Sequence, residues 1–184
     1  QQGPILAATG ADVTVFDNST KQLEKDNFVA QRDNLKIKTI QGNMQDLSAF
    51  KDETFDCIIH PWSNGYIDNV LPVWKECARV LKKNGLLLSG FGNPIEYIFD
   101  SGKIDQGILE VKYSIPYADI DHLEDPEIKQ IVESGGYIWS HTLEDQIQGQ
   151  IAAGFAIIGF YEDIGGTVLD NYINSSIATK AIKL

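Results

Sequence analysis

Asp17 is the residue in this sequence whose type and position most clearly suggest chemistry. It ends a predicted strand over residues 12–16, in which the four β-branched and aromatic residues at 13–16 indicate burial, and it precedes Ser19 and Gln22, whose spacing predicts a capping box at the start of a helix. An acid at the carboxyl end of a strand in an open α/β sheet can accept hydrogen bonds from both hydroxyls of a ribose. Alternatively, Asp17 only caps the following helix, since aspartate is a favoured cap.

The elements expected around Asp17 alternate between helices and strands. Pro4 in a first turn and Gly10 as a left-handed stop predict a helix over 1–10, and lysines on one face predict an edge strand over 35–41. The right-handed crossovers implied by this order predict a doubly wound α/β sheet. The remaining expected elements are a helix over 19–31, a turn over 42–47, a central parallel strand over 55–60, a polar loop over 61–66, a helix over 69–83 and a buried strand over 86–91. The helix over 69–83 places Val70, Trp74, Cys77, Ala78 and Leu81 along one apolar stripe.

The alternation breaks between residues 93 and 140. This segment contains a period-two pattern over 109–115 that predicts a strand, a short helix over 125–134 and several aromatic residues. A long insertion at the ligand-binding edge of a sheet is typical of a lid or a substrate wall. Beyond it we expect a capped helix from Thr142 to Gly154, and then an antiparallel pair of strands over 155–161 and 176–184.

The overall composition limits the classes of partner. The chain has 184 residues, 43% of them hydrophobic, and a formal net charge of −11 without a cluster of lysines or arginines. Such a chain can bury the core of one globular domain, but it lacks the positive charge on which nucleic-acid affinity mainly rests. No run is long and apolar enough to cross a membrane. Cys57 and Cys77 lie in apolar patterns, so we expect two buried free thiols and a reducing, cytoplasmic location.

Taken together, five segments resemble the class I S-adenosylmethionine-dependent methyltransferases. The resemblance extends over nearly the whole chain, in the order and spacing of that family. It implies an α/β fold with a doubly wound, mostly parallel sheet of seven strands, in which an antiparallel last strand lies between the fifth and the sixth. The matching segments are residues 13–19, 42–47, 53–60, 78–89, and 154–161 with 177–184.

The resemblance also implies S-adenosylmethionine as cofactor and assigns residues to its parts. Asp17 corresponds to the acid that binds the ribose, with Asn18 beside it, and the turn that begins at Asn43 corresponds to the adenine edge. The family usually has aspartate at the position of Asn43; asparagine keeps the acceptor oxygen but loses the charge. Further residues expected to contact the cofactor are Gln2, Gly3, Met44, Gln45, His60 and Pro61.

One part of the family pattern is missing from this sequence. The first strand and its glycine-rich loop have no counterpart, and Gln1, Gln2 and Gly3 resemble the end of that loop. The missing strand is the centre of the family's sheet, so its absence leaves two apolar strands with unpaired ladders. We therefore expect one methyltransferase domain over 1–184 that is incomplete at its N-terminus, with residues 93–140 as an inserted lid or substrate region.

Methyl transfer is an in-line displacement that depends mainly on positioning and needs no metal. It can require a base, and the expected candidates are His60, His141 and, less favoured because of its acidic surroundings, His122. Tyr66 is a further catalytic candidate. Five aromatic residues either build an acceptor pocket or cover the core: Trp62, Tyr66, Tyr97, Tyr117 and Trp139.

The sequence does not identify the methyl acceptor. We expect a small molecule, with no nucleic-acid or membrane partner, and a monomer or homodimer. Two other interpretations are a degenerate protein that binds the cofactor without turnover and acts by association, and a nicotinamide dehydrogenase. The dehydrogenase is disfavoured because the antiparallel terminal pair and the turn over 42–47 have no counterpart in it.

Overall fold

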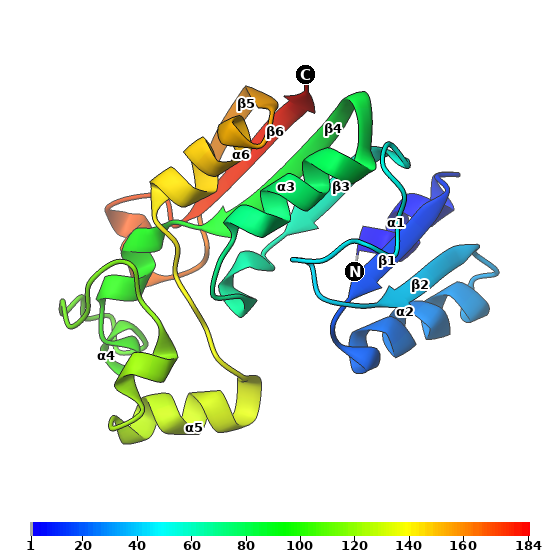
Figure 1. The fold of residues 1–184 in the computed structure, drawn as a ribbon. Coiled ribbons are helices and arrows are strands. Elements are labelled where there is room, and N and C mark those ends of the chain that lie inside the picture. The colour runs from blue at the N-terminus through cyan, green and yellow to red at the C-terminus, as the bar shows by residue number, and fades with distance from the viewer. Residues whose placement is uncertain (1) are drawn as a thin grey trace. The chain divides into compact units, whose positions relative to one another are not determined.

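The computed structural model describes residues 2–184, so Gln1, expected to begin the first helix, lies outside the described residues. The described chain forms two compact units (Figure 1). The first unit runs to Ala49 and the second is Phe50–Leu184. Among the described residues, no helix has the length and apolar character needed to cross a membrane.

The first unit is a two-stranded parallel sheet with two helices. Its elements are α1 (Gln2–Ala8), β1 (Val13–Asp17), α2 (Thr20–Arg32) and β2 (Ile37–Gln41). Gly10, with φ +93°, follows α1, and the Ser19 side chain accepts a hydrogen bond from the Gln22 amide at the start of α2. Both observations confirm the expected helix boundaries. The strands pair in parallel with Asp17 opposite Gln41, so their carboxyl ends lie at the same edge.

The second unit is built on a four-stranded sheet with the order β3-β4-β6-β5. β3 and β4 are parallel, whereas β6 lies antiparallel between β4 and β5. The expected antiparallel terminal pair is therefore confirmed, as is the α/β class with a last strand inserted between two earlier ones. The bounds are β3 (Phe55–Pro61), β4 (Leu81–Gly92), β5 (Phe155–Asp163) and β6 (Ser176–Lys183).

Two helical elements pack side by side on one face of this sheet (Figure 1). One is α3 (Leu71–Val80); the other is a π-helical turn, η4 (Glu144–Gln148), that continues into α6 (Gly149–Ala152). Trp74 of α3 is fully buried, and the stripe expected on this helix forms much of the core. The buried members of that stripe are Val70, Trp74, Cys77, Ala78 and Leu81.

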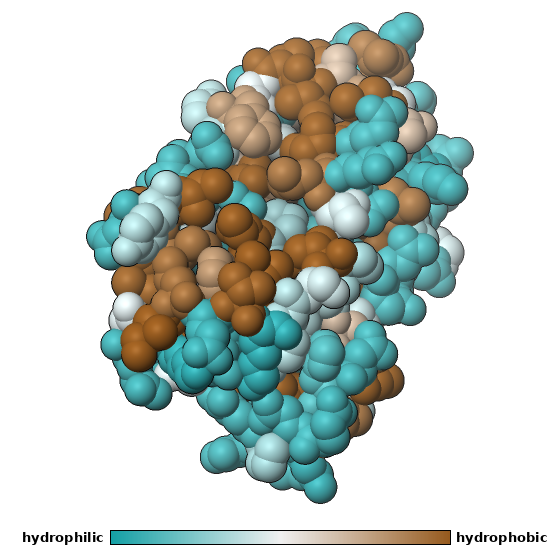
Figure 2. All heavy atoms as spheres, turned by 90° about the vertical axis from the view of Figure 1, so that its left-hand side faces the viewer, coloured by the Kyte–Doolittle hydropathy of each residue, from teal (hydrophilic) through white to brown (hydrophobic). Residues whose placement is uncertain are grey.

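The inserted segment leaves from the end of β4 and consists of short helices joined by turns (Figure 1). Asp125 caps α5 by accepting a hydrogen bond from the Glu127 amide, which confirms the expected helix there. In Figure 2, apolar side chains gather on the upper and middle parts of the face shown, while polar side chains cover its lower part. The elements of the segment are η2 (Pro94–Ile98), α4 (Ser101–Ile104), η3 (Asp119–His122) and α5 (Pro126–Gly135).

One expected boundary and one expected strand are wrong. The helix predicted over 69–83 ends at Val80, because the carbonyls of Arg79 and Val80 accept hydrogen bonds from the amides of Glu53 and Thr54. Leu81 therefore begins β4 in an extended conformation. The strand predicted over 109–115 is not formed either. Only one isolated bridge joins Val111 to Phe99, since no neighbouring strand is present to complete the ladder.

Cys57 is also not buried as expected. Both cysteines are free thiols, but only Cys77 is buried, and Cys57 is exposed on β3. Within the described residues β3 pairs with β4 alone, so the strand expected to be central lies at an edge of the four-stranded sheet. An edge strand leaves side chains without neighbours on one side, which accounts for the exposure of Cys57.

Candidate functional site

In the first unit, the site residues expected from the sequence lie at the carboxyl ends of β1 and β2. The Gly42 amide donates to the Asp17 carbonyl at 3.1 Å, which holds the turn after β2 against the end of β1. Gly42 allows this approach, because a Cβ there would lie 2.2 Å from Cζ of Phe16. Asp17, Asn18 and the turn from Asn43 therefore share one edge of the sheet.

Asp17 retains hydrogen-bonding capacity at this edge. Its Oδ1 accepts from the Ser19 amide at 2.7 Å, and Ser19 is the N-cap of α2, so one Asp17 oxygen supports the helix cap without being the cap itself. No hydrogen bond to Oδ2 occurs within residues 2–184. A carboxylate has about four acceptor positions, so the cap leaves room for a ribose hydroxyl. The structure is thus compatible with both roles of Asp17 at once.

The turn after β2 presents one donor and one acceptor. Asn43 Oδ1 accepts from the Gln45 amide at 3.0 Å, and its Nδ2 donates to Gln45 Oε1 at 3.3 Å. These bonds fix the orientation of the Asn43 amide while leaving a second lone pair on Oδ1. The Met44 amide makes no hydrogen bond within the described part of the chain. A donor and an acceptor side by side match the Watson–Crick edge of adenine.

The remaining first-unit candidates lie on or near α1. Gln2 begins α1, and Gly3 packs on β1, where a Cβ would lie 2.6 Å from Cγ2 of Val15. Asp26 of α2, which the sequence did not point to, is buried near Gly3, and its Oδ1 has no hydrogen-bond partner in the described structure. Burial raises the pKa of the Asp26 carboxyl.

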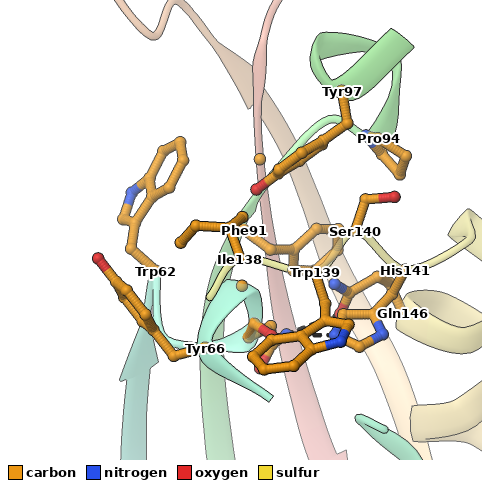
Figure 3. A pocket seen from close by; sticks show the side chains of 13 residues that line it. Trp62, Tyr66, Phe91, Pro94, Tyr97, Ile138, Trp139, Ser140, His141 and Gln146 are labelled. Atoms are coloured by element: carbon orange, nitrogen blue, oxygen red, sulfur yellow. Dashed lines mark hydrogen bonds between the residues drawn. The ribbon is translucent and has the colours of Figure 1, made fainter. Parts of the chain in front are cut away.

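In the second unit, a pocket of about 140 Å³ opens at the carboxyl ends of β3 and β4 (Figure 3). Trp62 follows β3 with φ +55° and donates its amide to the Gly90 carbonyl at 2.7 Å. In Figure 3, Trp62 and Tyr66 lie at the left of the pocket, Tyr97 above it and Trp139 below it. The residues that line it are Trp62, Asn64, Gly65, Tyr66, Phe91, Gly92, Pro94, Tyr97, Ile138, Trp139, Ser140, His141 and Gln146.

The catalytic candidates differ in their relation to this pocket. His141 and Tyr66 line it, whereas His60 and Pro61 do not. Of the five aromatic candidates, Tyr117 alone is not part of the lining: it is buried and donates its hydroxyl to Asp119 Oδ1 at 2.7 Å. The Tyr117 ring also stacks on His122, at 5.3 Å between centroids, and His122 is partly exposed.

A buried polar network joins His60 to two residues of the pocket lining, Asn64 and Gln146. His60 Nε2 lies 2.6 Å from Asn64 Oδ1, and Asn64 Nδ2 donates to Gln146 Oε1 at 2.7 Å. Because the Asn64 amide nitrogen faces Gln146, its oxygen faces His60, and the network assigns a proton to His60 Nε2. Burial lowers the pKa of His60, although the hydrogen bond to Asn64 opposes this effect. His60 is therefore a neutral side chain that holds Asn64.

His141 is fixed by the same loop but keeps one nitrogen for other partners. Its Nε2 lies 2.9 Å from the Asn64 carbonyl oxygen, which can only accept, so Nε2 carries the proton. Nδ1 makes no hydrogen bond within the described residues. A neutral histidine with an unprotonated Nδ1 at a pocket wall can accept a proton.

Asn64, Gln146 and Glu96 are site residues that the sequence did not identify. Gln146 lies in the π-helical turn, a geometry that is frequent at functional sites. Glu96 follows the Asn93–Pro94 turn beyond β4, and burial raises the pKa of its carboxyl to about 7, with a further contribution from Asp170. The sequence signal that could have pointed to Glu96 is its place in a turn directly after a central strand.

No metal site accompanies these groups: within residues 2–184, no cluster of three or more His, Cys, Asp or Glu side chains is suited to a metal ion. The Asp170 carboxylate, whose charge acts on Glu96, is fixed by hydrogen bonds from the protein and not by a metal ion. It accepts five hydrogen bonds, from the amides of residues 165, 166, 167 and 175 and from the Ser175 hydroxyl, which hold the pKa of Asp170 far below its usual range.

Comparison with known proteins places these features in a wider group. The family model described as "Methyltransferase domain" matches residues 2–89. The uncharacterized methyltransferase YbaJ of Bacillus subtilis (strain 168) is 56% identical over 185 residues, which cover 100% of this chain and 72% of the relative.

Solved structures with the same fold are more distant in sequence. An S-adenosylmethionine-dependent methyltransferase from Mesorhizobium loti superposes with a TM-score of 0.70 at 14% identity, covering 94% of this chain and 80% of that one. A geranyl diphosphate methyltransferase in complex with SAM has a TM-score of 0.62 at 15% identity, covering 95% of this chain and 70% of its own.

Proposed function

This chain belongs to the methyltransferase family and has its class I, S-adenosylmethionine-dependent fold, and on that premise we propose that it transfers a methyl group from S-adenosylmethionine to a small-molecule acceptor. The observation that carries the proposal is the edge shared by Asp17, Asn43 and Met44. This donor set fits a nucleoside: a carboxylate for the ribose hydroxyls, and an amide oxygen and a backbone N–H for adenine.

When bound, the cofactor supplies an electrophilic methyl group on a sulfonium. The side chains of this chain then have three tasks: to bind the nucleoside, to orient the acceptor, and to exclude water from the reacting atoms. We assign the first task to Asp17, Asn18, Asn43, Met44 and Gln45. Gln2, Gly3, His60 and Pro61 remain candidates for further contacts with the cofactor.

We assign acceptor binding to the pocket of the second unit. Residues 93–140, which we propose as a lid and substrate wall, contribute Pro94, Tyr97, Ile138, Trp139 and Ser140 to its lining. A volume of about 140 Å³ suits a small molecule. His141 is the candidate base because its Nδ1 is left to accept a proton, Tyr66 offers a hydroxyl at the same pocket, and His60 positions Asn64.

Further assignments follow from composition and remain part of the proposal. The net charge of −11 supports the absence of a nucleic-acid partner, and the two free thiols support a reducing, cytoplasmic location. We also propose that the protein works without a membrane partner, as a monomer or homodimer.

Calorimetric titration with S-adenosylhomocysteine tests the cofactor site. Asp17→Ala removes charge-assisted hydrogen bonds, so we expect binding to weaken by at least ~30-fold, or about 2 kcal/mol. Asp12→Ala is the matched control, because Asp12 is an exposed acid immediately before β1, at the opposite end from Asp17. The affinity of the Asp12→Ala variant for S-adenosylhomocysteine should change by less than about threefold.

Stability measurements on the same variants separate the two roles of Asp17. If Asp17 only caps α2, Asp17→Ala lowers the free energy of unfolding by about 0.5–2 kcal/mol and leaves binding unchanged. That result would remove the ribose assignment. Binding without methyl transfer to any member of an acceptor panel would instead favour a protein that holds the cofactor without turnover.

A further inference from the structure

Three side chains converge in front of Gly92, the last residue of β4 and part of the pocket lining. A Cβ on Gly92 would lie 2.9 Å from Glu96 Oε2, 3.5 Å from Cζ3 of Trp62 and 3.8 Å from Cε2 of Tyr97. One point on the pocket wall is therefore within 4 Å of a carboxylate oxygen and of two aromatic rings. Because Gly92 has no side chain, the Glu96 carboxylate can lie against the backbone there, where a Cβ would displace it.

The charges around the pocket have one sign. Its lining contains no lysine or arginine, and His141 is its only basic side chain. Two carboxylates lie beside the pocket without lining it. One is Glu96, next to Gly92; the other is the buried Asp119, which accepts hydrogen bonds from the Tyr117 hydroxyl at 2.7 Å and the Ile138 amide at 2.8 Å. A carboxylate or phosphate on the acceptor would find no cationic partner in such a pocket, which makes burial of an anion costly.

A cation meets the opposite conditions. The faces of tryptophan and tyrosine rings attract ammonium groups, and an adjacent carboxylate adds a direct electrostatic attraction. Trp62, Tyr66, Tyr97 and Trp139 surround the pocket, and Figure 3 shows these rings on its different sides. Rings on several sides together with an acid are the arrangement that recognises alkylammonium groups.

We propose that this pocket selects amine acceptors, binding them through their alkylammonium group at Glu96, Trp62 and Tyr97, so that the methyl group is added to nitrogen. The inference rests on the proposed methyl transfer. The bound ammonium loses one proton to His141 Nδ1, and the nitrogen lone pair attacks the methyl carbon. The carbon–sulfur bond breaks with its electron pair remaining on sulfur, and the positive charge passes to nitrogen. Substrate and product are then both cations.

The titration of Glu96 is consistent with this use. Burial, and next to it the charge of Asp170, raise the pKa of the Glu96 carboxyl to about 7. A bound cation has the opposite effect, because it stabilises the ionised carboxylate. Within the described residues, a hydrogen bond from Ser175 lowers the pKa of Glu96 in opposition to these two effects, and no lysine or arginine forms an ion pair with it.

The experiment compares choline with 3,3-dimethylbutan-1-ol, which has the same shape without the charge, by calorimetric titration of the full chain. We expect choline to bind at least ~10-fold more tightly than the alcohol. Glu96→Gln should remove most of that preference. Glu162→Gln should leave it intact, since Glu162 is an exposed glutamate on β5 outside the pocket. Trp62→Leu, at a half-exposed position, should weaken the binding of choline but not that of the alcohol.

Equal affinities for choline and the alcohol, or a preference unchanged by both Glu96→Gln and Trp62→Leu, would overturn the proposal. A titration with S-adenosylhomocysteine on the same preparation separates it from the proposed function. Cofactor binding without a choline preference would refute the amine pocket alone. A choline preference without cofactor binding would refute methyl transfer, and with it the methylation of nitrogen, while leaving the cation site in place.

Discussion

Replacing Asn64 with leucine should strongly destabilise the second unit. Asn64 is 1% exposed, and its side chain joins His60 to Gln146. Leucine has a similar volume but no polar atoms, so the substitution leaves the His60 Nε2–H and Gln146 Oε1 buried without partners. Each unpaired buried group costs about 1–3 kcal/mol, which gives an expected loss of about 2–6 kcal/mol.

Urea unfolding followed by tryptophan fluorescence measures this loss. Trp62, Trp74 and Trp139 all lie in the second unit, so the signal reports on that unit alone. With a dependence on urea of about 2 kcal/mol per molar, the midpoint should fall by roughly 1–3 M. Asn171→Leu is the matched control, because Asn171 is exposed in the same unit and should shift the midpoint very little.

A loss in Asn64→Leu below about 1 kcal/mol, or one equal to that of Asn171→Leu, would refute the reasoning. It would mean that His60 and Gln146 are not held by Asn64 in solution. The histidine would then be available for proton transfer, and the assignment of His60 as a positioning residue would be withdrawn.

Three further predictions concern reactivity and pH. Iodoacetamide should modify the exposed Cys57 in the folded chain, whereas Cys77 should react only after unfolding, since burial raises the pKa of its thiol to about 12; peptide mass spectrometry distinguishes them. Glu96→Gln should flatten the pH dependence of the free energy of unfolding between about pH 4.3 and 7. A carboxyl whose pKa is raised in the folded state stabilises that state fully at pH values below the pKa of the unfolded chain. This contribution is lost as the pH rises through the folded-state pKa of about 7. Asp170→Asn should lower the urea midpoint at pH 7, and the difference should shrink as the pH falls below about 4, because a lowered pKa stabilises the fold only while the carboxylate is ionised.

Each of these three predictions has a clear opposing outcome. Equal labelling of both cysteines without denaturant would show that Cys77 is accessible. A pH profile of Glu96→Gln that parallels the wild type would show that another group titrates in that range. An Asp170→Asn variant as stable as the wild type at pH 7 would show that the hydrogen bonds to the Asp170 carboxylate contribute little to stability.

Local patterns were sufficient to predict most of the fold. The strand before Asp17, the cap at Ser19 and the stop at Gly10 each depend on residues within one or two turns, and all three are present, although the strand is half-buried and not buried as expected. The stripe on α3 was predicted for the same reason. The errors occurred where distant residues decide. The end of α3 depends on amides of residues 53 and 54, and the pattern over 109–115 lacks a neighbouring strand.

The candidate site divides in the same way. Asp17 and the turn from Asn43 lie directly at strand ends, so the sequence points to them. Asn64 and Gln146, in contrast, meet across 82 residues of sequence, and neither lies in a recognisable motif. The role of Gly92 depends on three side chains that converge only in the folded chain. Contacts of this kind leave no periodic trace in a sequence.

The position of β6 has a consequence for the synthesis of the protein. Residues 176–183 pair on both sides, with β4 and with β5, so they occupy the interior of the sheet although they are translated after both of these strands. On the ribosome, β4 and β5 must therefore wait with open edges until β6 has emerged. Such non-local pairing slows folding and leaves unpaired strands exposed in the nascent chain. We expect this interval to be the stage at which the chain depends most on chaperones.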